Sequence, residues 1–135
     1  MDATGVRAWR SRRVIVADDS MRPTLEPGDR LLVEPLEPGS LPPRGAIVVL
    51  PDPEDPARRL VKRVAAVPGD PNPAAAPGDN PDVPPGRVVV LSDARDMGRD
   101  SRRFGPVPVA TLVGVAWWRY APNARRGALP GPTPP

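Results

Sequence analysis

The chain has 135 residues, enough for one compact domain and too few for two ordinary ones. It contains neither Cys nor His, which excludes disulfide scaffolds, thiol nucleophiles, Cys/His zinc sites and Ser-His-Asp triads. The net charge is +3, all but one of the 19 basic residues are Arg, and 23 Pro with 12 Gly confine the hydrophobic core to part of the chain.

Short apolar runs rich in β-branched residues follow one another along the chain. They are residues 13–18, 30–34, 46–50, 60–67, 86–92 and 111–120. Pro, Gly or Asp bounds each run, and none of the runs has the 3.6-residue period of a long helix. This pattern predicts an all-β fold, a small barrel-like or strongly coiled antiparallel sheet of short strands.

Three segments outside these runs are expected to be irregular. Residues 1–12 are predicted to be a flexible N-terminus, and residues 71–85, with six Pro, an exposed extended loop. Residues 121–135 are predicted to be a disordered Pro-rich tail. The ordered domain is therefore expected over residues 13–120.

The distribution of basic, aromatic and apolar residues indicates which partners and which cellular location to expect. Basic residues are scattered in pairs, and the aromatic side chains that could stack on bases are few, so no nucleic-acid partner is expected. No window approaches 18 apolar residues, and the first residues lack the apolar core of a secretory signal. We expect a soluble, cytoplasmic protein whose contact with a membrane would be peripheral, with no metal and no other cofactor.

The only lysine, Lys62, lies in the run 60–67. Because alternate side chains of a strand share a face, Leu60, Lys62 and Val64 point the same way. An amine between two aliphatic neighbours loses hydration, which favours its neutral form, and a neutral lysine can act as a general base. Arginine cannot, since it stays protonated. A surface lysine left by chance is the alternative interpretation.

A base of this kind needs a nucleophile, and Ser20 is the candidate. Ser20 follows the strand predicted over residues 13–18 and begins a turn. A hydroxyl delivered into a turn at the end of a strand lies beside free backbone N–H groups. Taken alone, Ser20 fits a turn or cap serine better. Its pairing with Lys62, and the resemblance described next, favour a nucleophile.

Four segments in order carry a resemblance to a known family. They read DDSMRPTLEPGDRLLV (18–33), PRGAIVVL (43–50), LVKRVAAVPGD (60–70) and LSDARDMGRDSRRFGPVP (91–108). They resemble the nucleophile box, the next strand, the lysine box and the C-terminal box of type I signal peptidases, which use a Ser/Lys dyad on a β-rich core shared with LexA-like proteins. The short chain and its ending also resemble the small soluble actinobacterial branch that includes nickel superoxide dismutase maturation peptidases.

The resemblance implies roles for individual residues. Ser20 would attack the scissile carbonyl, and Lys62 would take its proton and pass it to the leaving amine. The turn that surrounds the oxyanion would consist of Asp18, Asp19, Ser20 and Met21, with the Ser20 N–H as donor. Arg63, beside the base, would lower the pKa of Lys62 by its positive charge. The supporting residues are Arg63 and a set in the C-terminal box that is expected mainly as structural ion pairs: Asp93, Arg95, Asp96, Asp100, Ser101 and Arg102.

Five positions depart from the family pattern, and two of them, Ala94 and Met97, stand where the family usually has Asn. Asp18 stands where the family has Ser or Gly, the Ser serving as a second oxyanion donor, and an ionised carboxylate there opposes an oxyanion. Gly98 stands where a Ser commonly orients the lysine amine, and Ser92 stands where the family has Gly. Loss of one oxyanion donor costs roughly 10²–10³ in rate. A slow peptidase, one with a special substrate and a decayed one are all compatible with these changes.

The leading hypothesis for function is a serine endopeptidase that removes an N-terminal signal or pro-peptide from a precursor protein. It would cut after small residues, with the precursor bound as an extended strand. Two alternatives stay open: a LexA-like peptidase that cleaves itself, and a catalytically impaired β-domain that serves as a peptide-binding module.

Overall fold

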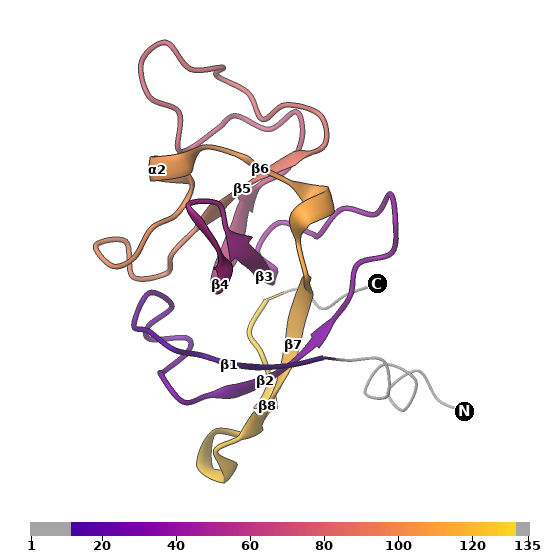
Figure 1. The fold of residues 1–135 in the computed structure, drawn as a ribbon, viewed down its shortest axis with the longest axis vertical. Coiled ribbons are helices and arrows are strands. Elements are labelled where there is room, and N and C mark those ends of the chain that lie inside the picture. The colour runs from indigo at the N-terminus through magenta and orange to yellow at the C-terminus, as the bar shows by residue number, and fades with distance from the viewer. Residues whose placement is uncertain (1–11, 132–135) are drawn as a thin grey trace.

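The computed structural model describes residues 12–131, and Figure 1 shows their ribbon. The upper part of the view holds β3 to β6, the lower part holds β1, β2 and β8, and β7 runs between the two. The flexible N-terminus predicted over residues 1–12 lies outside the described residues except for Arg12, which belongs to the first strand.

One antiparallel sheet accounts for most of the described residues. Its strands are β1 (Arg12–Ile15), β2 (Arg30–Glu34), β3 (Ile47–Asp52), β4 (Asp55–Ala66), β5 (Arg87–Leu91), β6 (Val107–Pro108), β7 (Gly114–Ala121) and β8 (Gly127–Ala128). The helical turns are α2 (Ser101–Phe104), η1 (Val109–Thr111) and η2 (Asn123–Arg125). The strands follow the order β1-β2-β7-β3-β4-β5-β6, with β8 beside β7. The predicted all-β class is confirmed, and since β1 and β6 end the order, the described strands form an open sheet.

Both faces of β3 are buried, and β3 therefore joins two halves of the core. Alternate side chains of a strand point to opposite faces. Ile47 and Val49 pack into a cluster that also holds Met21, from the loop after β1. Val48 and Leu50 pack into a second cluster, with side chains of β4, β5 and β7. The segments on either side of β3 are thus fixed relative to one another by one strand.

β4 is longer than the run predicted over residues 60–67. It begins at Asp55 and forms a hairpin with β3, in which Asp52 lies opposite Asp55. Asp52 Oδ1 accepts the N–H of Glu54 at 2.9 Å and so stabilises the tip. The first half of β4 is exposed on both faces, so no apolar periodicity could reveal it.

The prediction of a disordered tail from residue 121 is wrong for the part of the tail that the structure describes. β7 ends at Ala121, η2 follows, and β8 then pairs with β7. Leu129 is 6% exposed and packs into the cluster that contains Met21. One apolar anchor therefore orders a segment whose Pro-rich composition suggested disorder. Residues 132–135 lie outside the described range.

The Pro-rich segment 71–85 forms a long loop between β4 and β5, at the top of Figure 1. Side chains cap its turns: Asn72 Oδ1 and Asp79 Oδ2 each accept a backbone N–H at 2.8 Å. Such bonds satisfy backbone donors where no partner strand is available.

Candidate active site

Ser20 lies in the loop that joins β1 to β2, residues 16–29, which we call the Ser20 loop. The ends of this loop meet where the N–H of Val16 donates to the carbonyl oxygen of Asp29 at 2.8 Å. Met21, directly after the serine, is 1% exposed and belongs to the core. Ser20 itself is 3% exposed. The Ser20 loop is therefore packed against the core, and this packing fixes the position of the serine side chain.

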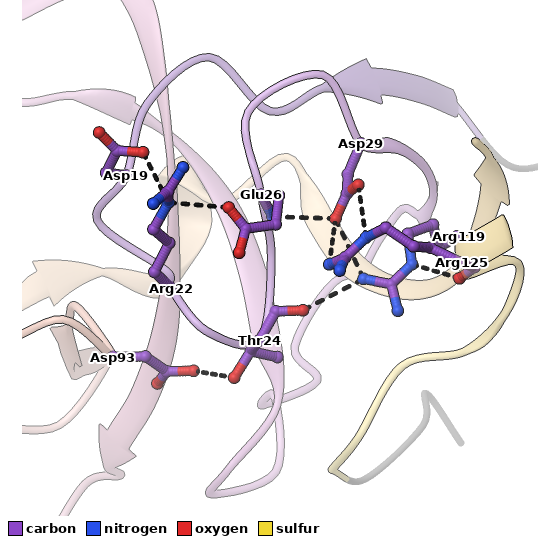
Figure 2. Close-up of polar contacts among 8 residues, drawn as sticks. All are labelled: Asp19, Arg22, Thr24, Glu26, Asp29, Asp93, Arg119 and Arg125. Carbon is purple, nitrogen blue, oxygen red and sulfur yellow. Dashed lines mark hydrogen bonds and ion pairs between the residues drawn. The ribbon is translucent and has the colours of Figure 1, made fainter.

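Figure 2 shows the charged side chains that anchor the Ser20 loop. Arg119 and Arg125 both donate to Oδ2 of the buried Asp29, at 3.0 and 3.1 Å. Arg119 also donates to the carbonyl oxygen of Thr24 at 3.1 Å, and Thr24 Oγ1 donates to Asp93 Oδ2 at 2.7 Å. The loop is thus held from β7, from η2 and from the segment after β5.

Lys62 lies on the buried face of β4. Its exposed fraction is 0%, and Leu60 and Val64 on the same face are also buried. Val61 and Arg63, on the opposite face, are partly exposed. The predicted alternation along this strand is confirmed, and the amine is enclosed as that alternation requires.

Burial is the main cause that lowers the pKa of Lys62. Nearby charges act in both directions, those of Asp18 and Asp100 raising this pKa and those of Arg99 and Arg102 lowering it. Arg63, expected to supply positive charge here, instead donates to Asp93 through Nη2 at 2.8 Å and to the carbonyl oxygen of Gly45 at 2.7 Å. A buried amine with a lowered pKa is neutral at lower pH than an exposed lysine and is thus suited to accept a proton.

Ser20 and Lys62 come together at Gly98. A Cβ atom on Gly98 would lie 3.1 Å from Lys62 Nζ and 3.7 Å from Ser20 Oγ. Lys62 Nζ donates to Ser92 Oγ at 3.0 Å, and among the described residues no hydrogen bond joins Nζ to Ser20 Oγ. The hydroxyl and the amine therefore border one small space, which the missing side chain of Gly98 leaves open.

The carboxylate of Asp18 accepts a hydrogen bond from the Ser20 N–H, which is the backbone donor that the resemblance assigns to the oxyanion. Asp18 Oδ1 accepts the N–H of Ser20 at 3.0 Å. Partial desolvation raises the pKa of Asp18, but hydrogen bonds from the backbone and side chain of Ser20, with the charges of Lys62 and Arg58, hold this pKa below its ordinary value. The carboxylate is therefore ionised, and the Ser20 N–H becomes free only when Asp18 turns away.

The start of the C-terminal box docks onto the Ser20 loop. Asp93 accepts Arg63 Nε at 2.9 Å in addition to Nη2, and the N–H of the residue after Asp93 donates to the carbonyl oxygen of Ser20 at 2.9 Å. Arg95 and Asp96, also expected as supporting residues, are exposed and make no hydrogen bond or ion pair within the described part of the chain. The structure thus places Asp93 in the site and leaves Arg95 and Asp96 in solvent.

The residues at the end of the C-terminal box make contacts around Ser92, the hydrogen-bond partner of Lys62. Asp100 is 2% exposed and caps α2, accepting the N–H of Arg102 at 3.0 Å and its Nε at 2.9 Å. Asp100 also accepts the N–H of Ser92 at 2.9 Å. Ser101 Oγ accepts the N–H of Val90 at 2.9 Å. These contacts tie α2 to the end of β5, which is the structural role expected for these residues.

A small cavity adjoins the serine. It has a volume of about 40 Å³, and its lining includes Val16, Ser20, Met21 and Val61. A shallower hollow of about 440 Å³ is lined by Arg13, Val14, Ile15, Ala17, Asp18, Arg58 and Arg59. Asp18 and Arg59 also line the small cavity, so the two together form a groove between β1 and β4 that reaches Ser20.

Ser92 and Arg99 were not among the site residues selected from sequence. Ser92 contacts the amine of Lys62, and Arg99 pairs with the fully buried Asp52 while its charge lowers the pKa of Lys62. The register of β4 against β5 would be needed to find Ser92, and pattern alone does not supply it.

Residues 12–131 contain neither a cluster of potential metal ligands nor a helix suited to cross a membrane. No group of three or more potential metal-binding side chains occurs there. No helix in this range combines the length and the apolar character that crossing a bilayer requires.

The sequence is similar to a known group of peptidases. The family model described as signal peptidase, peptidase S26, matches residues 3–71 and 72–121. A mitochondrial ATP-independent inner membrane protease subunit 1b of Arabidopsis thaliana is 42% identical over 123 residues, which are 85% of this chain and 72% of that protein. A probable signal peptidase I-1 of Synechocystis is 33% identical over 145 residues, covering 84% of this chain and 73% of the relative. A solved signal peptidase I of Enterococcus faecalis aligns with a TM-score of 0.46 and 23% identity, over 56% of this chain and 97% of that one.

Proposed function

The chain belongs to the signal peptidase family, peptidase S26, and from this premise we propose that it is a serine endopeptidase with Ser20 as nucleophile and Lys62 as general base. Its reaction is the removal of an N-terminal signal or pro-peptide from a precursor protein. The observation that supports these roles most is the meeting of a buried lysine, whose pKa is lowered, with a serine hydroxyl at Gly98. This pairing supplies a nucleophile and a base without His or Cys.

In the proposed mechanism, Ser20 Oγ attacks the scissile carbonyl carbon while Lys62 Nζ takes the hydroxyl proton. The tetrahedral intermediate collapses as the C–N bond breaks, and the ammonium of Lys62 gives its proton to the leaving amine. The acyl-enzyme is then hydrolysed by water, which Lys62 deprotonates in turn. The Ser20 N–H stabilises the oxyanion in both steps once Asp18 has left it.

The substrate is proposed to bind as an extended strand in the groove between β1 and β4. β1 ends the strand order, so one of its edges has no partner strand among the described residues and can pair with a peptide. The cavity beside Ser20 measures about 40 Å³. That is on the order of the volume of one water molecule or one methyl group, which favours cleavage after a small side chain.

One observation favours the second candidate, a catalytically impaired domain that binds peptides. The carboxylate of Asp18 lies on the Ser20 N–H at 3.0 Å. If Asp18 stayed there with substrate bound, the same groove would hold a peptide without stabilising an oxyanion, and binding would occur without cleavage.

The experiment that separates the two candidates uses the purified full chain and co-expressed precursor proteins that carry an N-terminal extension ending in a small residue. The N-termini of the products are read by mass spectrometry. We expect one new N-terminus with the wild-type chain and none with Ser20→Ala or Lys62→Arg, while Ser40→Ala, a serine on another loop, serves as the matched control.

Cleavage that survives Lys62→Arg would contradict the dyad, because arginine cannot act as the base. Precursor that co-purifies uncut with the wild-type chain would favour the binding module instead.

A further inference from the structure

The amine of Lys62 has one hydrogen-bond partner among the described residues, the hydroxyl of Ser92. In the antiparallel pair of β4 and β5, Arg63 lies opposite Leu91, the last residue of β5, so Ser92 leaves the strand beside Lys62. Both side chains are buried, each with an exposed fraction of 0%. The contact is thus built into the register of two core strands.

The acceptor is itself fixed in place. The N–H of Ser92 donates to Asp100 Oδ2 at 2.9 Å, and Asp100 is held by Arg102 and by its position as the cap of α2. An oxygen anchored in this way restricts rotation of the amine that donates to it. A neutral amine has two N–H bonds and one lone pair, and only the lone pair can take a proton from a hydroxyl.

We propose that Ser92 is a positioning residue for the peptidase reaction: by accepting an N–H from Lys62 Nζ it turns the lone pair of the amine toward Ser20. This inference rests on the roles proposed above for Ser20 and Lys62. Ser92 acts through Lys62 and does not touch the reacting carbonyl.

Gly98 explains why the hydroxyl has to come from the residue directly after β5. A Cβ atom at position 98 would lie 2.9 Å from Ser20 Cβ and 3.1 Å from Lys62 Nζ, and the φ of Gly98 is +75°, where glycine is favoured. A side chain there would press on both the serine and the lysine. Position 98 is therefore suited to glycine alone, and the hydroxyl that contacts the amine is that of Ser92.

The test uses the fact that Lys62 is the only lysine in the chain. Protein grown with isotope-labelled lysine gives one side-chain NMR signal, whose titration reports the pKa of Lys62 without any substrate. A hydroxyl that accepts a hydrogen bond stabilises the ammonium, so Ser92→Ala should lower this pKa. In cleavage assays the same variant should lose kcat by about tenfold or more, because misplacement of a reacting group costs rate, with KM changed less than about twofold.

Three further variants test whether the effect is specific to Ser92. Ser92→Thr retains the hydroxyl and should keep most of kcat. Ser101→Ala also removes a buried serine hydroxyl, one that accepts the N–H of Val90, and should cost stability while leaving the Lys62 titration where it is. The exchange variant with Ser92→Gly and Gly98→Ser should not recover activity, because the new Cβ would lie against Ser20.

The inference is overturned if Ser92→Ala leaves the Lys62 titration unchanged, or if the exchange variant cleaves as fast as wild type. A wild-type chain that cuts no precursor would instead refute the proposed function. The NMR titration would still decide whether Ser92 holds the amine, so the two failures are distinguishable.

Discussion

Asp18 Oδ1 accepts the backbone N–H of Ser20 at 3.0 Å, two residues along the chain. The donor that a serine peptidase uses for the oxyanion is therefore already paired with an ionised carboxylate. Removing that carboxylate frees a hydrogen bond that is worth most in the transition state, where negative charge develops on the substrate oxygen.

We predict that Asp18→Gly raises kcat by about tenfold or more, within the range that one oxyanion donor contributes. The charge of Asp18 also raises the pKa of Lys62, so the acid limb of the pH–rate profile should move to lower pH in this variant. Steady-state rates from pH 5 to 10 measure both effects, with Asp19→Asn as the control for its neighbour. A variant slower than wild type would mean that Asp18 takes part in the chemistry.

Gly98→Ala should abolish most of the activity. Its Cβ would lie 2.9 Å from Ser20 Cβ and 3.1 Å from Lys62 Nζ, and a displacement of about 1 Å at a reacting group can cost on the order of 100-fold in rate. Gly78→Ala is the matched control, since Gly78 also has a positive φ but open space around its Cβ position. Both variants should lose roughly 1–2 kcal/mol of stability. Equal activities of the two would refute the contact with the dyad.

Replacing Lys62 by Met should stabilise the fold. Burial lowers the pKa of Lys62 in the native state, so the unfolded chain binds more protons at pH values between the native and unfolded pKa of this group. The lysine therefore makes stability rise with pH through that window, and below it the cost of the buried charge is fully present. Thermal unfolding from pH 5 to 9 should show a higher Tm for Lys62→Met, with the difference largest at low pH. A lower Tm would mean that the amine stabilises the native state.

Asp29 is expected to carry much of the stability of the Ser20 loop at neutral pH. Burial raises its pKa, but hydrogen bonds from Arg125, Glu26 N–H and Arg119 outweigh this and hold the pKa below its ordinary value. Asp29→Asn should cost about 3 kcal/mol at pH 7, the usual result of breaking a buried pair. That stability is present above the unfolded pKa of Asp and is lost as pH falls through the native one.

Urea unfolding at pH 7 and at pH 3 measures the effect of Asp29→Asn, and the difference from wild type should shrink at the lower pH. Asp19→Asn is the control, because the pair of Asp19 with Arg22 is exposed and should contribute less than about 1 kcal/mol. Equal losses for the two variants would contradict the anchoring role of Asp29.

Leu129→Ala should cost about 2–3 kcal/mol of stability, as is usual for a buried leucine. Leu129 is 6% exposed in the same cluster as Met21, so its loss should also loosen the Ser20 loop and raise hydrogen exchange there. Leu41→Ala, at an exposed leucine, is the control. An unchanged midpoint in urea would mean that the C-terminal segment is not bound to the core.

Several features of the site could be predicted because they are local. The alternation of Leu60, Lys62 and Val64 follows from strand geometry, and the lack of His and Cys follows from composition. The assignment to the branch of nickel superoxide dismutase maturation peptidases stays a prediction, because membership of the family does not distinguish its branches.

Other features depend on contacts between distant segments. The anchoring of residues 121–131 depends on Leu129 reaching a core formed by β1 to β3, and a composition count cannot register one buried side chain. The pairing of Arg63 with Asp93 likewise depends on the fold, since the position of Arg63 next to Lys62 along the chain predicts instead that its charge acts on Lys62.

The sequence by itself determined which groups are available for chemistry: one lysine on an apolar strand face and a serine at the end of a strand. It did so because the strand period of two residues is a local property of the backbone. Only the tertiary structure decided what these groups contact. The pairing of β4 with β5 puts Ser92 on the amine of Lys62, and the packing of Gly98 brings Ser20 and Lys62 to the same place. Hydrogen bonds act over about 3 Å, and only the fold sets distances between side chains on that scale.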